Sequence, residues 1–195
     1  VSRDRIALVP NGCDLGLFAR PDNSPDRPEG VSDNDLMAVF TGTHGQANGL
    51  DSVLDAAAEL KARGRNDIKL VLIGNGKLKP QLQADATARQ LNNVIFLPSV
   101  RKTELVGYMA QADLGMQCLA NIPAFYYGTS PNKFFDYIAA GLPVLNNYPG
   151  WLAEMINDNR CGFAVPADDA TAFADALENA ADNREELAAM GSRAK

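Results

Sequence analysis

The chain has 195 residues, of which 46% are hydrophobic and 22% are charged, a composition typical of a globular protein with a hydrophobic core. Its formal net charge of −6 leaves no basic footprint for nucleic acid. No apolar run approaches the ~20 residues that a membrane-spanning helix needs, and we expect neither a transmembrane segment nor a signal peptide.

The cysteine and histidine content excludes two common kinds of site. The cysteines are Cys13, Cys118 and Cys161, which are far apart and odd in number. This pattern predicts free thiols in a reducing compartment, not a disulfide framework or a metal site. The single histidine, His44, leaves little room for a zinc site or a histidine-based triad. Because the chain begins with Val1 and not with methionine, we expect it to be a piece of a longer protein.

Apolar runs that can form strands alternate along the chain with segments of helical spacing. The expected strands cover residues 5–9, 36–41, 69–73, 93–97, 113–117, 143–145 and 162–165. The expected helices cover residues 50–60, 78–91, 103–111, 131–141 and 150–157, with one or two more between 170 and 192. A turn at residues 10–12 and an exposed loop at residues 20–34 precede the second strand. The helix at 103–111 starts with a pattern typical of a capping box, in which Thr103 or its neighbour is the cap and Glu104 follows closely.

This alternation predicts an α/β fold with an open, parallel, Rossmann-like sheet and helices on both faces. The ligands of such sheets bind outside the carboxyl ends of the strands. We therefore expect the loops that follow the strands to gather at one edge of the sheet. These loops cover residues 42–49, 74–76, 98–100, 118–130 and 146–150.

The most informative stretch runs from residue 130 to residue 144. Pro131 suits the first turn of a helix, Ser130 can cap the free N–H groups beside it, and Gly141 can end the helix. Lys133 falls in the first turn, where free N–H groups and the positive end of the helix dipole favour a phosphate. One turn later, Asp136 can accept hydrogen bonds from sugar hydroxyl groups. A phosphate cradle followed by a diol-binding acid indicates a nucleotide or a nucleotide sugar.

Short motifs over nearly the whole chain resemble, in their order, the C-terminal nucleotide-sugar-binding domain of GT-B fold, family 4 retaining glycosyltransferases. The matching segments are residues 9–14, 40–42, 49–51, 72–76, 93–97, 112–113, 136–144 and 161–165. The Ser-Pro-Asn-Lys sequence at 130–133 further resembles the branch that builds bacterial O-antigen, capsule or colanic acid, which includes N-acetyl-L-fucosamine transferases. The resemblance implies that residues 1–195 form one half of a GT-B fold, and that an N-terminal acceptor domain is absent from this chain.

The resemblance also implies roles for individual residues. Asp136 matches the second acid of the E-x7-E signature of the family, which binds the ribose hydroxyl groups. The loop that approaches the diphosphate matches Gly42, Thr43 and His44. The strand end whose backbone reads the base matches Ser99, Val100 and Arg101. The loop and helix start that hold the diphosphate and the sugar match Ser130, Asn132, Lys133 and Phe134.

Simpler interpretations stand beside these roles. Lys133 and Asp136 have the alternative of being ordinary surface residues of a helix, and His44 that of a loop residue with no role in binding. The aromatic residues at 125–127 can either line the sugar site or pack the loop down.

The chain departs from the family pattern at three positions. The first acid of E-x7-E would fall at Gly128, and the arginine and lysine that neutralise the diphosphate would fall at Thr43 and Asn48. We expect Lys133, the helix N-terminus and Arg101 to replace those cations. No metal ion and no further cofactor are expected.

The resemblance implies transfer of a sugar, with retention, from a nucleotide diphosphate to a glycan or lipid-linked acceptor. UDP is favoured because that branch commonly uses it, and a cytoplasmic location follows, at the inner membrane face if the acceptor is lipid-linked. The alternatives are a nucleotide-sugar epimerase of GT-B type and a non-catalytic nucleotide-binding module. A dinucleotide-dependent dehydrogenase is disfavoured, because no G-x-G-x-x-G motif lies at a strand–helix junction.

Overall fold

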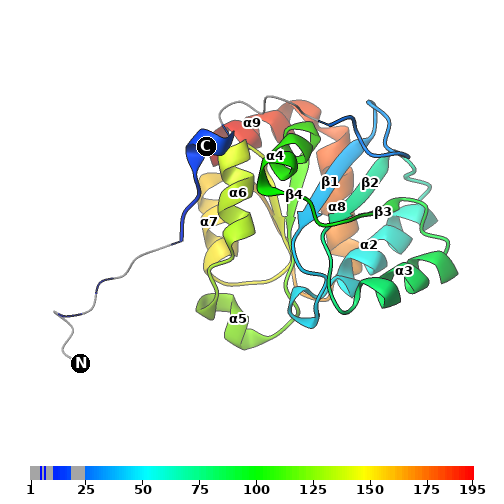
Figure 1. The fold of residues 1–195 in the computed structure, drawn as a ribbon, viewed down its shortest axis with the longest axis horizontal. Helices are drawn as coiled ribbons and strands as arrows, with labels where there is room; N and C mark the ends of the chain where they lie inside the picture. The colour runs from blue at the N-terminus through cyan, green and yellow to red at the C-terminus, as the bar shows by residue number, and fades with distance from the viewer. Residues whose placement is uncertain (1–4, 6, 8–10, 19–24) are drawn as a thin grey trace.

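A computed structural model of the chain describes residues 5, 7, 11–18 and 25–195. Most of the strand predicted at 5–9, the start of the turn at 10–12 and part of the loop at 20–34 lie outside these residues. The described strands form one parallel sheet in the order β3-β2-β1-β4-β5-β6 (Figure 1). Their bounds are β1 Leu36–Thr41, β2 Ile68–Ile73, β3 Val94–Leu97, β4 Leu114–Gln117, β5 Val144–Asn146 and β6 Gly162–Ala164.

Helices cover both faces of the sheet, as the sequence predicts. One face carries α2, α3 and α8, and the other carries α4, α6 and α7, while α9 runs along the end of the sheet opposite α5 (Figure 1). The helix bounds are α1 Leu15–Phe18, α2 Asp51–Ala62, α3 Lys79–Ala88, α4 Lys102–Gln111, α5 Pro123–Gly128, α6 Asn132–Ala140, α7 Trp151–Asn159, α8 Ala170–Asp182 and α9 Arg184–Ala194. A short 3-10 helix, η2, covers Gln46–Asn48.

The alternation of side chains along the central strand divides the core into two layers. Every residue of β1 is buried. Leu36, Ala38 and Phe40 pack against α2, α3 and α8, whereas Met37 and Val39 pack against α4, α6 and α7. A strand covered on both faces favours apolar side chains throughout, which explains the apolar run from Leu36 to Phe40, and the buried Thr41 at its end contacts the hydroxyl of Tyr137.

The strand order creates a crevice at the carboxyl edge of the sheet. After β1 the chain moves outward through β2 and β3, and it then returns to place β4 on the other side of β1. The direction of winding therefore changes between β1 and β4, which is the position where ligands of open parallel sheets bind. Thr41 is paired with Ile73, and Ile73 with Leu97, so the loops after these strands start at the same level.

Two predictions differ from the structure by more than a shift of one or two residues at the end of an element. The helix predicted through Leu91 ends at Ala88, because Gln90 adopts a positive φ of 55° and Leu91 starts the approach to β3. The predicted loop at 118–130 contains the short helix α5, whose Pro123 occupies a first-turn position. Proline is tolerated there because the first N–H groups of a helix have no intrahelical partner.

The two predicted side-chain caps are wrong. The N-cap of α4 is Arg101, not Thr103, and the N-cap of α6 is Pro131, not Ser130. Neither cap residue makes a side-chain hydrogen bond to its helix. The end of α6 is as predicted, since Gly141 adopts the left-handed conformation with φ of 74° that favours glycine.

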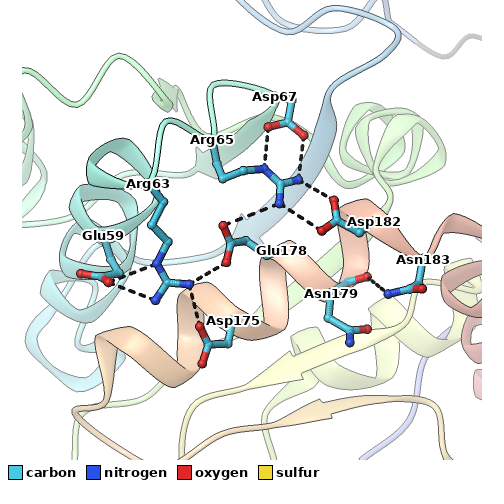
Figure 2. A network of polar contacts seen from close by, with 9 residues as sticks. All are labelled: Glu59, Arg63, Arg65, Asp67, Asp175, Glu178, Asn179, Asp182 and Asn183. Atoms are coloured by element: carbon cyan, nitrogen blue, oxygen red, sulfur yellow. Dashed lines mark hydrogen bonds and ion pairs between the residues drawn. The ribbon is translucent and has the colours of Figure 1, made fainter.

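A network of charged residues joins α2 to α8 near the amino end of β2 (Figure 2). Arg63 forms ion pairs with Glu59 at 3.0 Å, and with Asp175 and Glu178 at 2.6 Å each. Arg65 pairs with Asp67, which precedes β2. It also pairs with two carboxylates of α8, those of Glu178 and Asp182. The network connects segments that are more than 100 residues apart in the sequence.

Replacing Arg63 tests the contribution of this network to stability. We expect Arg63→Met to lower the free energy of unfolding by about 1 kcal/mol at low salt, because several part-exposed ion pairs are lost together. The effect should shrink in 1 M salt, where the Debye length is about 3 Å. Urea denaturation at both salt concentrations measures it. Lys61→Met, which removes a charge from the same helix together with one hydrogen bond, is the control. An equal loss in both variants would contradict a special role of the network.

Candidate functional site

A pocket of about 330 Å³ opens at the carboxyl ends of β1, β2 and β3. Its lining residues are Gly42, Thr43, Ile73, Gly74, Asn75, Ser99, Val100 and Leu105. The structure therefore brings together four of the residues proposed from the sequence, which are Gly42, Thr43, Ser99 and Val100. Arg101 is exposed and follows directly as the N-cap of α4.

Backbone contacts between neighbouring loops shape this pocket. The Gly42 N–H donates to the Ile73 carbonyl at 3.0 Å, and the Gly74 N–H donates to the Leu97 carbonyl at 3.2 Å. The Lys79 ammonium group donates to the carbonyl oxygens of Gly74 and Leu97 at 2.7 and 2.6 Å. Lys79 thereby joins the turn after β2 to the end of β3, a role that the sequence pattern did not reveal.

Asn75 adds a polar side chain to the rim of the pocket. Its Nδ2 donates to the Ser99 hydroxyl oxygen at 3.1 Å, which joins the turn after β2 to the end of β3. The sequence pattern indicated only a turn at this position, because the partner lies 24 residues away.

Lys133 extends from the first turn of α6 to the loop after β1. Its Nζ donates to Asn48 Oδ1 at 2.6 Å and lies 4.3 Å from the centre of the Phe40 ring. Asn48 in turn donates through Nδ2 to the Thr43 carbonyl at 2.7 Å. A Cβ placed on Gly42 would lie 3.6 Å from Lys133 Cε, so the lysine runs directly beside this glycine.

The charge of Lys133 is not compensated within the described part of the chain. No carboxylate of residues 5, 7, 11–18 and 25–195 forms an ion pair with it, and its polar contact is the neutral side chain of Asn48. Burial lowers the pKa of the Lys133 ammonium group to about 8. An enclosed cation beside free N–H groups of a helix N-terminus is suited to an anion.

Asp136 lies one turn further along α6 and is largely buried, so it is not an ordinary surface acid. Its side chain is 12% exposed, and Oδ2 contacts the ammonium group of Lys102 at the start of α4. Sequence reasoning missed Lys102, because its partner lies 34 residues away. The only sequence feature that could have indicated a role for Lys102 is its place directly after another cation, Arg101.

Two residues assigned to the ligand from the sequence are instead core residues. His44 is fully buried with its ring 6.1 Å from the rings of both Phe40 and Phe96, and neither ring nitrogen has a hydrogen-bond partner among the described residues. Burial, with a smaller contribution from nearby Lys79, lowers the pKa of His44 to about 4, so the ring is neutral. The ring therefore does not line the pocket described above, and its neutral form agrees with an apolar environment.

The side chain of Phe134 is also fully buried, against the rings of Phe135 and Trp151. Its N–H donates to the Pro131 carbonyl at 3.2 Å, so this group is engaged in the helix start. The hydrophobic side of α6 must face the sheet, which explains why this residue points away from the anion site.

The remaining predicted residues lie at the entrance to α6. Ser130 and Asn132 are exposed, and the Ser130 carbonyl accepts a hydrogen bond from Asn11 Nδ2. At Gly128 no described atom lies within 4 Å of an added Cβ, so the position of the missing acid faces open space.

The aromatic residues of α5 divide between packing and exposure. The ring of Tyr126 stacks on Tyr148 with centres 6.4 Å apart, whereas the side chain of Tyr127 is exposed and its hydroxyl donates to Glu154 at 2.6 Å. Trp151 Nε1 donates to the Thr129 carbonyl at 2.8 Å and thus holds the end of α5. Packing therefore explains most of this cluster, and Tyr127 is the ring left at the surface.

The described residues lack two further kinds of feature. No group of three or more histidine, cysteine, aspartate or glutamate residues is arranged to hold a metal ion within the described ranges. No helix in the described part of the chain is both long and apolar enough to cross a membrane.

Comparison with known proteins places the chain in a family. The family described as glycosyl transferases group 1 matches residues 23–195. A D-inositol 3-phosphate glycosyltransferase from Nocardia farcinica is 30% identical over 98% of this chain and 43% of its own length. A candidate colanic acid biosynthesis glycosyltransferase, WcaL, from Escherichia coli is 24% identical over 99% of this chain and 46% of its own length. The chain thus spans less than half the length of these relatives.

Solved structures agree on the fold. The crystal structure of Anabaena HepE in complex with UDP superposes with a TM-score of 0.72 at 19% identity, covering 94% of this chain and 50% of HepE. At this identity the likeness establishes the Rossmann-like fold of one GT-B half. Because the family match covers most of the sequence, the chain belongs to the glycosyl transferases group 1 family.

Proposed function

We propose that residues 1–195 form the donor-binding domain of a retaining glycosyltransferase that takes its sugar from UDP. The observation that carries the proposal is the uncompensated ammonium group of Lys133 between the N-terminus of α6 and the Gly42 loop. A diphosphate is the anion that fits this position, because it needs a cation and several N–H donors at once. The UDP bound in the HepE structure supports the choice of nucleotide.

The order of groups along the sheet edge matches the parts of a nucleotide sugar. The pocket at Ser99 and Val100 would take the base, and Asp136 would take the ribose hydroxyl groups. The diphosphate would lie against Lys133, with the sugar directed toward the exposed start of α6 at Ser130 and Asn132.

The contact between Lys133 and Asn48 supports the replacement of the missing cations. Family members are expected to carry a lysine at the position of Asn48 and an arginine at that of Thr43. Lys133 Nζ lies 2.6 Å from Asn48 Oδ1, so a cation reaches the same loop from a different helix. Arg101, exposed at the start of α4, is the second proposed cation.

Catalysis would then rest on orienting the donor and stabilising the departing diphosphate electrostatically. The acid of the proposed site, Asp136, is paired with the ammonium group of Lys102, whereas double displacement uses a pair of carboxyl groups. We propose that an N-terminal domain outside this chain binds the acceptor, which is a bacterial surface glycan or a lipid-linked sugar. The same domain would supply the catalytic histidine. The similarity to WcaL supports placing this chain in the branch that builds bacterial polysaccharides. We propose that the N-acetyl-L-fucosamine transferases of that branch are relatives of this chain. We propose that the protein acts in the cytoplasm.

Calorimetric titration of the chain with UDP, GDP, UDP-N-acetylhexosamine and NAD tests this proposal. We expect binding of the uridine nucleotides, no binding of NAD, and no sugar transfer by the chain alone. Asp136→Ala should weaken UDP binding by about tenfold, because the hydrogen-bond acceptor for the ribose hydroxyl groups is lost. Failure to bind any of the four compounds, or equal binding of NAD, would contradict the proposed donor site.

The open space at Gly128 favours a second candidate, a non-catalytic nucleotide-binding module. The missing acid would otherwise contact the donor sugar, so a protein that no longer transfers sugar could dispense with it. The full-length protein distinguishes the two functions. The module predicts UDP binding without turnover of UDP-sugars in the presence of acceptor, whereas the transferase predicts release of UDP.

A further inference from the structure

The ion pair between Lys102 and the proposed ribose-binding acid, Asp136, connects the base pocket to α6. Lys102 is the first residue of α4 and its ammonium group contacts Oδ2 of Asp136. The same ammonium group lies 5.5 Å from the centre of the Phe18 ring in α1. The two partners differ in exposure, since 45% of the Lys102 side chain but only 12% of the Asp136 side chain is accessible.

The unequal exposure indicates which partner depends on the other. Lys102 can be solvated without Asp136, whereas the largely buried carboxylate of Asp136 needs a cation or hydrogen-bond donors to offset the cost of its burial. The hydrogen bond from Lys102 uses Oδ2, and no described residue donates to Oδ1, which leaves that oxygen for donors of a ligand. A carboxylate oxygen that is held in place with free lone pairs is suited to accept from a pair of neighbouring hydroxyl groups.

The position of Lys102 in the chain gives the ion pair a second consequence. It follows Val100, which lines the pocket, and Arg101, which caps α4. The ion pair therefore holds the loop between β3 and α4 against α6. The acid is an aspartate, one methylene group shorter than the glutamate of the family signature, so its carboxylate lies closer to the backbone of α6.

We propose that Lys102 is a positioning residue for ribose recognition. It holds Asp136 by Oδ2, presents Oδ1 to the ribose hydroxyl groups, and keeps the base-binding loop at a fixed distance from that acid. This inference rests on the proposed function, because it requires a nucleotide whose ribose lies at Asp136. Lys102 itself need not touch the nucleotide.

Titration calorimetry with UDP and 2′-deoxy-UDP on the 195-residue chain tests the inference. The wild-type chain should prefer UDP, and Lys102→Met should lose about tenfold in UDP affinity together with most of that preference. Lys102→Arg, which keeps the charge, should retain the preference. Asp136→Asn should lose it, and the exposed Lys77 offers a charge-matched control, Lys77→Met, that should behave as wild type.

The comparison of the two nucleotides separates positioning from a structural role. If Lys102→Met keeps the wild-type ratio of UDP to deoxy-UDP affinity, or binds UDP more tightly, the inference is wrong while the donor site stands. If the wild-type chain binds neither nucleotide, the proposed function fails first. Circular dichroism verifies folding, and Lys102→Gln replaces Lys102→Met in the same comparison if the methionine variant is unfolded.

Discussion

Lys133→Met should weaken UDP binding by about a hundredfold, the largest binding effect that we expect from one substitution. Removing one partner of an enclosed charge pair costs about 3 kcal/mol, which is two powers of ten in affinity. Methionine keeps an apolar stem against the Phe40 ring but cannot donate to Asn48 or to a phosphate oxygen. Calorimetry at pH 7 measures the loss, with Lys77→Met as the charge-matched control.

The lowered pKa of Lys133 predicts that UDP affinity falls with rising pH, whereas the contribution of this residue to the free energy of unfolding rises. In the free chain the ammonium group has a pKa of about 8, against 10.5 for an ordinary lysine. UDP binding requires the charged form, so affinity should fall as the pH rises above about 8. Between pH 8 and 10.5 the unfolded chain binds more protons than the folded chain at this residue, so its contribution to the free energy of unfolding rises with pH.

Both trends should be absent from Lys133→Met, because they have one origin. Calorimetry between pH 7 and 9.5 follows the affinity, and urea denaturation over the same range follows the stability. A wild-type affinity that does not change across this range, or a variant that binds UDP as well as wild type, would show that the diphosphate lies elsewhere.

Gly74→Ala should have the largest effect on the fold at the site. Gly74 adopts a φ of +147°, and a Cβ there would lie 1.9 Å from the Gly42 carbonyl oxygen. The contact involves backbone on both sides, so no side chain can rotate away. We expect the free energy of unfolding to fall by about 3 kcal/mol or more, because steric overlap in a packed region adds to backbone strain.

Gly64→Ala is the matched control for backbone strain alone. Gly64 also has a positive φ, of 75°, but nothing lies within 4 Å of an added Cβ. This variant should lose only about 1 kcal/mol, the cost of placing a residue with a Cβ in the left-handed region. Urea denaturation compares the two variants, and UDP titration should show weaker binding for Gly74→Ala only. Equal losses of stability would mean that the two loops do not approach as closely as described.

Local sequence patterns determined the elements and the order of the layers. The apolar run at 36–41 became β1 with unchanged bounds, and Gly141 ended α6 as predicted. These features depend on which residues a buried strand tolerates and on which residue accepts a positive φ, and both preferences act over a few neighbouring positions. The placement of Gly42 near Ser99 also followed, since carboxyl ends of parallel strands share one edge.

Tertiary structure alone decided which polar groups meet at that edge. Lys133 reaches Asn48 across 85 residues, and Lys102 reaches Asp136 across 34. Thr43 and His44 follow Gly42 in the same loop. Thr43 lines the pocket, whereas the ring of His44 turns into the apolar layer beside Phe40. Side-chain direction in a loop and pairing between distant charges are set by the packing of whole elements, so no local spacing in the sequence encodes them.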